Sequence, residues 1–282
     1  MQYIKNIDSF ELKDIFECGQ CFRWNKENDG SYTGVFYDRI LNVNKIGNQV
    51  IFNGNATDNE INFYFDLDRD YTKIKNKLSL VDSNLKKSVE YGSGIRILNQ
   101  DLFETIISFI ISANNNIPRI KSIIERICEK YGKELEYNNK KYYTFPTPSE
   151  LAKATISDLR KLGLGFRDER VYETCQMINS KQFCIDELSY LKTEKLREKM
   201  LTLPGVGPKV CDCILLFSTL KRFDVFPIDV WVRRVMNELY IKNVDESKVN
   251  KKEIKQIADE KFGNLEGIAQ QYLFYWKRDT SA

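Results

Sequence analysis

The sequence contains no histidine among its 282 residues. This absence excludes Ser-His and Cys-His nucleophile pairs and most zinc enzymes, which need imidazole as a base or as a metal ligand. Any catalytic chemistry must therefore use lysine, acidic, tyrosine or cysteine side chains, or the backbone. Neither sign of charge dominates, because 43 Lys and Arg stand against 40 Asp and Glu, so composition alone does not predict a polyanionic partner.

Long apolar runs are also missing. The longest, around residues 106–111, is far shorter than the roughly 20 residues needed to cross a bilayer. Residues 1–16 have no uninterrupted apolar stretch, so we expect neither a membrane span nor a secretory signal. The seven cysteines are an odd number spread along the chain, which favours a reducing compartment over a disulfide framework. We therefore expect a cytoplasmic protein.

Two regions of the chain differ in their hydrophobic periodicity. Short alternating segments at residues 22–24, 32–43, 49–52 and 61–67 predict β-strands, and turn-forming pairs with glycine lie between them. After Asp70 the spacing becomes helical. The sequence therefore predicts an α+β fold in which an N-terminal antiparallel β-sheet domain, residues 1–90, packs on a larger all-α domain, residues 91–282.

Several local signals predict helix ends in the second region. Residues 101–113 predict a buried apolar helix, and Pro118 suits the first turn of the next helix. Residues 147–150, Thr-Pro-Ser-Glu, form a capping box that predicts a helix through about residue 154. Tight turns at residues 163–167 and 203–207 each interrupt a pair of helices, which predicts two helical hairpins.

The segment LTLPGVGPKV, residues 201–210, is the most informative part of the chain. Gly205 and Gly207 permit a tight turn, and Pro208 fits the first turn of a following helix. Free backbone amides at such a helix start bind phosphate oxygens, which is typical of a helix-hairpin-helix motif that holds a DNA backbone. Lys209 lies where the helix dipole disfavours an ammonium group, as a lysine nucleophile requires. The alternative roles for Lys209 are a solvated side chain or a phosphate contact.

Asp229 follows twenty residues later, in the segment Pro-Ile-Asp-Val at residues 227–230. Its simplest role is that of a helix N-cap, worth about 1 kcal/mol. A carboxylate held by backbone amides is also suited to stabilise positive charge on a deoxyribose as its base departs. The two roles are compatible.

The hairpin with Lys209 and the segment with Asp229 together resemble the signature of the helix-hairpin-helix (HhH-GPD) base-excision DNA glycosylases. Three further segments resemble the 8-oxoguanine DNA glycosylase/AP lyase branch, namely GQCFRW at 19–24, NNNIPR at 114–119 and LGLGFR at 162–167. The resemblance covers nearly the whole chain. It implies an enzyme that flips 8-oxoguanine out of duplex DNA, cleaves its N-glycosidic bond through a lysine Schiff base and nicks the strand by β-elimination. Lys209 would be the nucleophile and Asp229 the essential carboxylate.

The resemblance also implies a base pocket. Cys213 and Phe274 would stack on the flipped base, and Gln270 would bind its Watson–Crick edge. The Gly19 carbonyl would accept the hydrogen on N7 that distinguishes 8-oxoguanine from guanine. Phe217 would form part of the pocket wall, where many relatives have methionine. Taken alone, these positions are more typical of a turn, the core or a helix surface.

A further group of residues would contact the DNA around the lesion. By resemblance, Asn114, Arg119 and Arg167 would hold the orphaned opposite base, normally cytosine. Phe166 would fill the gap in the base stack as a wedge. Trp231 stands where better-known members carry a histidine that contacts phosphate, which is a departure in DNA binding and not in chemistry. Surface arginines and a buried phenylalanine are the simpler alternatives.

No cofactor is implied for catalysis. The backbone carbonyls of Leu201, Leu203 and Val206 would hold a structural cation at the hairpin. Because no cysteine lies beyond Cys213, we expect no C-terminal iron–sulfur cluster. The expected partner is duplex DNA containing an oxidised guanine, bound by a monomer without involvement of a membrane.

Two other functions stay open. A monofunctional alkyl-base glycosylase of the same fold would use Asp229 to activate water and would need no lysine at position 209. A non-catalytic helix-hairpin-helix module would only grip phosphates, with Lys209 as one contact among several.

Overall fold

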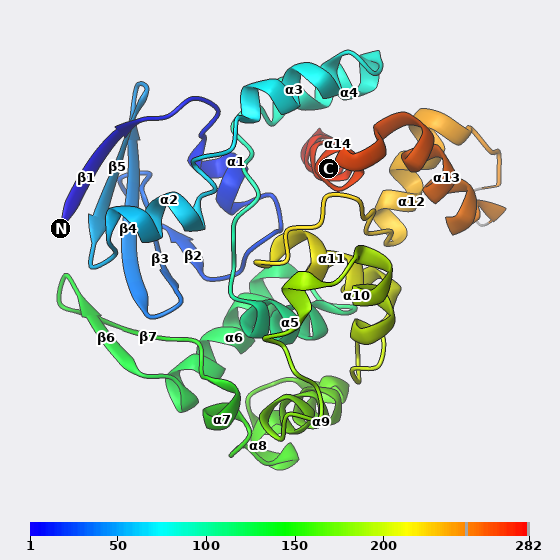
Figure 1. Cartoon of the computed structure of the whole chain (residues 1–282). Helices are drawn as coiled ribbons and strands as arrows, with labels where there is room; N and C mark the ends of the chain where they lie inside the picture. Colours follow the sequence, from blue (N-terminus) through cyan, green and yellow to red (C-terminus); the bar gives the residue numbers. More distant parts are fainter. Residues whose placement is uncertain (246–247, 281–282) are drawn as a thin grey trace.

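An antiparallel five-stranded sheet forms the N-terminal part of the protein (Figure 1). A computed structural model describes residues 1–245 and 248–280. The strands lie in the order β1-β5-β4-β3-β2. Their bounds are β1 (Gln2–Asn6), β2 (Trp24–Lys26), β3 (Tyr32–Phe36), β4 (Arg39–Ile46) and β5 (Gln49–Gly54). Helices α1 (Leu12–Phe16) and α2 (Asp58–Tyr64) accompany the sheet.

The sheet has an aromatic core of its own. The Trp24 ring stacks on Phe16 with centroids 4.3 Å apart, and its indole N–H donates to the Tyr64 hydroxyl at 3.0 Å. Such pairs contribute packing and satisfy the buried indole donor at once. The start of β2 is therefore held firmly, directly after the loop that contains Gly19.

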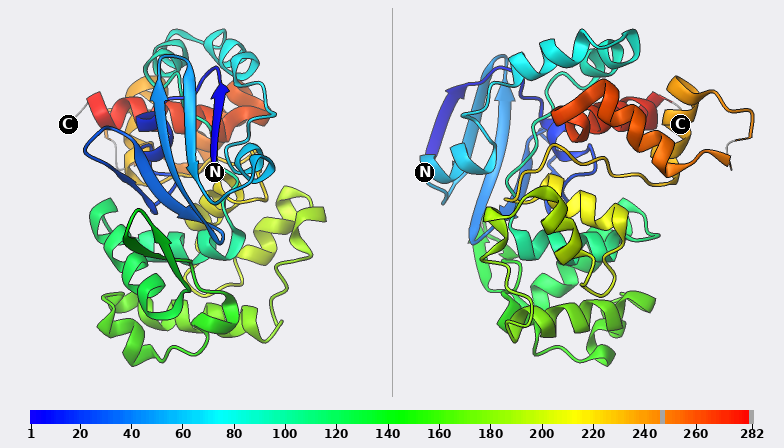
Figure 2. Two further views of the ribbon diagram at one scale, coloured as in Figure 1. Left: turned by 90° about the vertical axis from the view of Figure 1, so that its left-hand side faces the viewer. Right: turned by 45° about the vertical axis from the view of Figure 1, so that its right-hand side comes forward.

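The remainder of the chain is mainly helical. Its helices are α3 (Tyr71–Ser79), α4 (Ser83–Tyr91), α5 (Leu102–Ser112), α6 (Ile117–Tyr131), α7 (Pro148–Leu151), α8 (Ile156–Lys161), α9 (Asp168–Asn179), α10 (Thr193–Met200), α11 (Pro208–Phe217), α12 (Val230–Met236), α13 (Lys251–Phe262) and α14 (Glu266–Thr280). A two-stranded sheet of β6 (Glu134–Tyr137) and β7 (Lys140–Tyr143) extends from this part, as Figure 2 shows. The predicted fold class, an N-terminal antiparallel sheet with a larger helical part, is confirmed.

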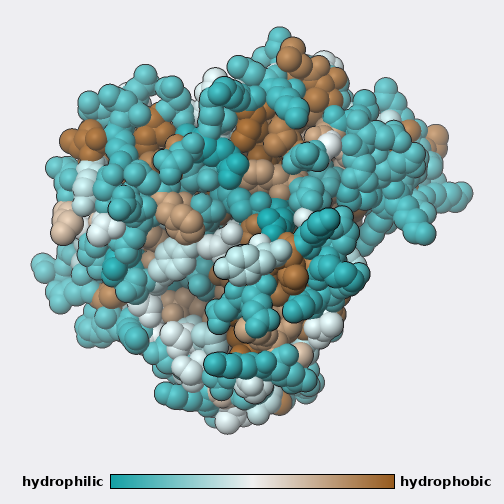
Figure 3. Space-filling model, in the orientation of Figure 1, coloured by the Kyte–Doolittle hydropathy of each residue, from teal (hydrophilic) through white to brown (hydrophobic). Residues whose placement is uncertain are grey.

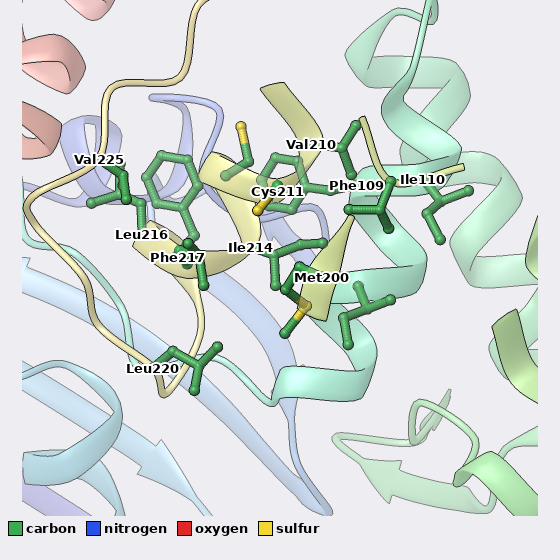
Figure 4. Close-up of a cluster of buried hydrophobic side chains, with 14 of the residues drawn as sticks. Phe109, Ile110, Met200, Val210, Cys211, Ile214, Leu216, Phe217, Leu220 and Val225 are labelled. Carbon is green, nitrogen blue, oxygen red and sulfur yellow. The ribbon is translucent and has the colours of Figure 1, made fainter. Parts of the chain in front are cut away.

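Helices α5 and α11 form the centre of the helical core. In α11 all residues except the first two are buried, and its apolar side chains pack against α5 (Figure 4). The rings of Phe109 and Phe217 stack with centroids 5.6 Å apart and planes 17° apart. Helix α14 packs against α4 and α12. Lys209, in the first turn of α11, therefore stands on a rigid support.

Several sequence predictions need correction. The strand predicted at residues 61–67 is wrong, because α2 covers residues up to Tyr64. A capping box starts this helix, in which the Thr57 hydroxyl accepts from Glu60 N and the Glu60 carboxylate accepts from Thr57 N. The segment predicted as one strand at 32–43 is two strands, separated by a turn in which Tyr37 has φ 50°.

Other boundaries also shift. Strand β1 and the β6–β7 pair were not predicted, and the helix predicted to run to about residue 154 ends at Leu151. The division of the chain at residue 90 stays a prediction. The face seen in Figure 3 is mainly hydrophilic, with smaller hydrophobic areas. Across residues 1–245 and 248–280, no helix combines the length and the apolar character that a membrane span needs.

Candidate active site

One cavity gathers all the residues predicted to catalyse the reaction or to bind the base. It lies where the loop before β2, the start of α11, the segment before α12 and helix α14 meet. Its lining residues are Cys18, Gly19, Phe109, Lys209, Cys213, Phe217, Pro227, Asp229, Gln270, Gln271 and Phe274. These residues come from positions as far apart as 18 and 274, so only the fold brings them together.

The hairpin between α10 and α11 presents Lys209 to this cavity. Gly205 has φ +82°, and Gly207 is the N-cap of α11 with no side-chain cap. The amides of Gly207 and Lys209 are therefore available at the helix start, where the dipole favours an anion. The Thr174 hydroxyl donates to the Pro204 carbonyl at 2.9 Å and fixes the hairpin on α9.

Lys209 lines the cavity close to Phe109. Its ammonium nitrogen lies 5.5 Å from the centre of the Phe109 ring. Burial raises the pKa of the Cys213 thiol to about 11, and the nearby Lys209 amine partly offsets this effect. The thiol therefore stays neutral, and Cys213 offers an apolar surface one helical turn from the amine.

Asp229 caps helix α12 as predicted. Its carboxylate accepts a hydrogen bond from Val232 N at 2.7 Å, and its backbone is extended. Its charge also acts on the Cys213 thiol, whose pKa it raises in addition to the larger effect of burial. The carboxylate is thus fixed by the helix start and faces the same cavity as Lys209.

The Gly19 loop is held by buried amides. Gln271 donates to the Cys18 carbonyl at 2.6 Å, and Gln100 donates to the Gln20 carbonyl at 2.8 Å. Gly19 itself has φ +89°, a conformation that favours glycine. Its carbonyl accepts no hydrogen bond from residues 1–245 or 248–280. The Gly19 carbonyl can therefore accept a hydrogen bond from a ligand, while the carbonyls of Cys18 and Gln20 on either side are held in place.

Helix α14 supplies the rest of the pocket. Gln270 is 5% exposed, and its side-chain oxygen has no hydrogen-bond partner in the described part of the chain. Phe274, one turn further, is half-buried. Phe217, at the end of α11, is buried and also lines the cavity. An unpaired acceptor beside an aromatic ring is suited to a flat ligand with a donor edge.

The residues predicted to hold the opposite base lie around one exposed turn. Asn114 is exposed with φ 51°, and Arg119 donates to the Gly163 carbonyl at 3.5 Å. Arg167 is only 2% exposed and donates to the carbonyls of Ala113 and Asn114. In the free protein Arg167 therefore supports the Asn114 turn.

Phe166, in the short helix η1 (Gly165–Arg167), is 56% exposed. The guanidinium carbons of Arg167 and Arg170 lie 4.2 Å and 5.6 Å from its ring centre. Burial, with the nearby Arg119 and Arg170, lowers the pKa of Arg167, which shows how closely the cations gather. An exposed ring beside two arginines is suited to enter a nucleic acid.

The remaining predicted residues are the phosphate contact at Trp231 and the hairpin carbonyls. The Trp231 indole N–H is buried and has no acceptor in residues 1–245 and 248–280. The Leu203 carbonyl accepts from Val206 N at 3.0 Å inside the hairpin. No group of three or more His, Cys, Asp or Glu side chains in the described residues could hold a metal ion.

Sequence reasoning missed the residues that position the site. Gln20, Gln100 and Gln271 are each nearly fully buried, and all three amides bond to backbone around the Gly19 loop. Arg278 on α14 also donates to the loop, at the Glu17 carbonyl. Gln20 and Gln100 lie in loops and Gln271 lies in α14, and no sequence signal separates these roles from a surface position.

Comparison with known proteins finds two family models that match successive parts of the chain. A family model for the 8-oxoguanine DNA glycosylase N-terminal domain matches residues 2–106, and a model for HhH-GPD superfamily base excision DNA repair proteins matches residues 107–262. A probable N-glycosylase/DNA lyase from Methanothermobacter thermautotrophicus is 31% identical over 235 residues, which cover 76% of this chain and 73% of the relative.

Solved structures agree with this match. The apo form of Clostridium acetobutylicum 8-oxoguanine glycosylase/lyase is 45% identical, with a TM-score of 0.92 over 98% of this chain and 96% of that chain. The same enzyme in complex with double-stranded DNA containing cytosine opposite to 8-oxoguanine gives a TM-score of 0.93 at 44% identity, over 100% and 99% of the chains. The chain therefore belongs to the 8-oxoguanine DNA glycosylase/lyase family of the HhH-GPD superfamily.

Proposed function

We propose that this protein removes 8-oxoguanine from duplex DNA and then cleaves the strand at the resulting site. The observation that carries the proposal is the single cavity in which Lys209 and Asp229 meet the residues predicted to bind the base. The match to the family of N-glycosylase/DNA lyases over both regions of the chain supports the same function.

The proposed chemistry begins with the uncharged amine of Lys209. The amine attacks C1′ of the nucleotide, the C1′–N9 bond breaks, and the base leaves with the bonding electron pair and takes up the proton that the amine loses. Asp229, fixed by its bond to Val232 N, stabilises the positive charge that develops on the sugar. Opening of the sugar ring gives an iminium link to Lys209. Loss of a proton from C2′ then expels the 3′ phosphate by β-elimination.

The other site residues would bind the DNA. The Gly19 carbonyl is free to accept the N7 hydrogen of 8-oxoguanine, whereas guanine would present a lone pair to that acceptor. Cys213 and Phe274 line the same cavity and would stack on the base, and Gln270, which also lines it, would bind the Watson–Crick edge. Phe166 is exposed enough to serve as the wedge. Asn114, Arg119 and Arg167 would hold the opposite base.

The proposal includes no cofactor for catalysis. The carbonyls of Leu201 and Val206 accept no hydrogen bond from the described residues, which supports a structural cation at the hairpin. The absence of an iron–sulfur cluster stays a prediction. All seven cysteines are free thiols, which supports the proposed cytoplasmic location.

Borohydride trapping tests the proposal. A duplex with 8-oxoguanine opposite cytosine is incubated with the protein and reductant, and we expect a covalent adduct, because only an amine nucleophile is reduced onto DNA. Lys209→Gln should abolish the adduct and base release while DNA binding persists. The control Lys199→Gln removes an exposed lysine on the neighbouring helix α10 and should change neither.

The alternatives give different results. A monofunctional alkyl-base glycosylase would release alkylated bases without an adduct and would tolerate Lys209→Gln. A binding module would bind the duplex and release no base at all. Base release that survives Lys209→Gln would overturn the proposed nucleophile.

A further inference from the structure

Arg170 is an exposed residue in the first turn of helix α9. Within residues 1–245 and 248–280 its guanidinium forms neither a hydrogen bond nor an ion pair. The carboxylate of Asp168, in the same turn, is already paired with Arg160 at 2.6 Å. A guanidinium presents five donors in a planar fork, so this group is suited to bind an anion that approaches from solvent.

The side chain of Arg170 lies between the hairpin and the proposed wedge. A Cβ atom built on Gly205 would be 3.1 Å from Arg170 Cβ and 3.2 Å from its Cδ, so the apolar stem packs against the hairpin. At the other end, the guanidinium carbon is 5.6 Å from the centre of the Phe166 ring. The Thr174 hydroxyl, one turn further along α9, donates to the Pro204 carbonyl at 2.9 Å and holds the helix and the hairpin together. One arginine therefore contacts both elements that are proposed to meet the DNA.

Positive charge gathers around this position. Arg119 and Arg170 lower the pKa of Arg167, although burial of Arg167 has the larger effect. Arg119 and Arg167 donate to backbone carbonyls, and none of the three arginines pairs with a carboxylate in the described part of the chain. Like charges without counter-ions repel one another, and a polyanion would relieve that repulsion. The surface around Phe166 is therefore complementary in charge to a DNA backbone.

The contact with the hairpin distinguishes Arg170 from Arg167. Arg167 donates to the Asn114 carbonyl, at the turn where the opposite base is proposed to lie. Arg170 instead packs on Gly205, close to the uncapped start of α11. Because amides at a helix start bind phosphate oxygens, a DNA backbone held there brings further phosphates within reach of Arg170.

From this position, and on the basis of the proposed function, we infer that Arg170 binds a phosphate of the DNA backbone between the hairpin and the wedge. The contact adds a charge to the grip of the hairpin, at the point where Phe166 would enter the base stack. Because phosphates carry no information on sequence or damage, Arg170 contributes to the binding of undamaged and damaged duplexes alike.

The test compares Arg170→Met with the control Lys87→Met, since each removes one positive charge. Lys87 is exposed on helix α4 and forms no ion pair with any described residue. Helix α4 lies at the opposite end of the molecule from α9 (Figure 1, Figure 2). Binding constants are measured by fluorescence anisotropy over a series of salt concentrations, for an undamaged duplex and for a duplex with an uncleavable tetrahydrofuran analogue of an abasic site.

We expect Arg170→Met to weaken the binding of both duplexes about 3- to 10-fold at low salt, the effect of one lost phosphate contact. The slope of log K against log salt should fall in magnitude by about 0.9, so the difference from the unaltered protein shrinks about threefold between about 50 and about 200 mM salt. Arg170→Lys keeps the charge and should keep the slope. Methionine preserves the apolar stem, so the melting temperature of Arg170→Met should not change. Lys87→Met should change neither slope nor affinity, because salt screens a charge at that distance.

The inference fails in three cases. The first is an unchanged salt slope in Arg170→Met, and the second is an equal change of slope in Lys87→Met, which indicates a general effect of net charge. The third is a loss confined to the abasic duplex, or a loss that Arg170→Lys shares in full, which indicates that Arg170 acts on the Phe166 ring and not on a phosphate. Failure of the unaltered protein to release 8-oxoguanine, with the salt slopes as expected, would instead contradict the proposed catalysis and not the phosphate contact.

Discussion

The hairpin offers two glycines at which the same substitution should have opposite consequences. Gly205 has φ +82°, and an added Cβ would lie 3.0 Å from Ile110 Cγ2 and 3.1 Å from Arg170 Cβ. Gly207 has φ −88°, and a Cβ there would meet nothing within 4 Å. Replacement of each by alanine therefore tests backbone strain at one position and free access to the backbone at the other.

The expected magnitudes follow from these geometries. Alanine in the left-handed region costs roughly 1–2 kcal/mol, and the tight contacts add to this cost. Alanine also reduces the entropy of the unfolded chain, which returns about 0.4–1 kcal/mol. We expect Gly205→Ala to destabilise the protein by about 1–3 kcal/mol. At Gly207 the entropy gain and the loss of an N-cap glycine roughly cancel, so we expect a change within about 0.5 kcal/mol.

DNA binding should be weakened by the substitution at Gly207, the one that has little effect on stability. Gly207→Ala places a methyl group on the open side of the helix start, where a phosphate oxygen would approach, and should weaken binding of an abasic duplex with little change in stability. Urea unfolding with an unchanged slope gives the stabilities, and fluorescence anisotropy gives the affinities. The reasoning is refuted if Gly205→Ala unfolds at the same urea concentration as the unaltered protein, or if Gly207→Ala binds DNA equally well.

Three further predictions concern other parts of the protein. Burial raises the pKa of Glu104 to about 7, an effect that Arg23 partly offsets. Between about pH 4.5 and 7 the folded state therefore binds more protons at this group than the unfolded state. The contribution of Glu104 to stability falls as pH rises through that window. Glu104→Gln should remove this pH dependence. In urea titrations, the stability of the variant relative to the unaltered protein should rise by on the order of 2 kcal/mol between pH 5 and 8. Parallel stability profiles of the two proteins over this range would contradict the prediction. Asp229→Asn keeps an acceptor for Val232 N and should change stability by less than about 1 kcal/mol while base release falls about 100-fold or more, so a fully active variant would exclude an essential carboxylate. The Phe166 side chain is 56% exposed, so Phe166→Ala should leave the melting temperature unchanged while it weakens binding to lesion duplexes. If the variant and the unaltered protein bind those duplexes with equal affinity, the wedge role is excluded.

The hairpin and its flanking helices could be predicted because their signals are local. Pro208 and the two glycines define a turn and a helix start by backbone sterics alone, and α10 and α11 meet there as expected. The strand predicted at 61–67 is wrong because two local signals conflict there. Its alternating aromatic residues are typical of a strand, but the capping box at Thr57 starts a helix before them.

The residues proposed for catalysis and for the base pocket were identified by resemblance, and the residues that hold them in place were not. Asp229 is a recognisable N-cap in its own segment, whereas the function of Gln100 depends on backbone 80 and 117 residues away, at Gln20 and Phe217. Such long-range bonds leave no periodicity in the sequence. Arg167 illustrates the same point, because its motif predicts a base contact while its donors bond to the Asn114 turn.

Recognition of one hydrogen on N7 requires more than a carbonyl in the right place. Repulsion between the Gly19 oxygen and the lone pair of guanine discriminates only if the peptide cannot rotate away. The carbonyl of Cys18 is fixed by Gln271 from α14, and the carbonyl of Gln20 is fixed by Gln100 from the segment before α5. Both donors are buried, so water does not compete for these bonds. The proposed role of Gly19 as a selective acceptor therefore requires the sheet and the helical part to be packed together, and loosening that contact should reduce specificity before it reduces strand cleavage.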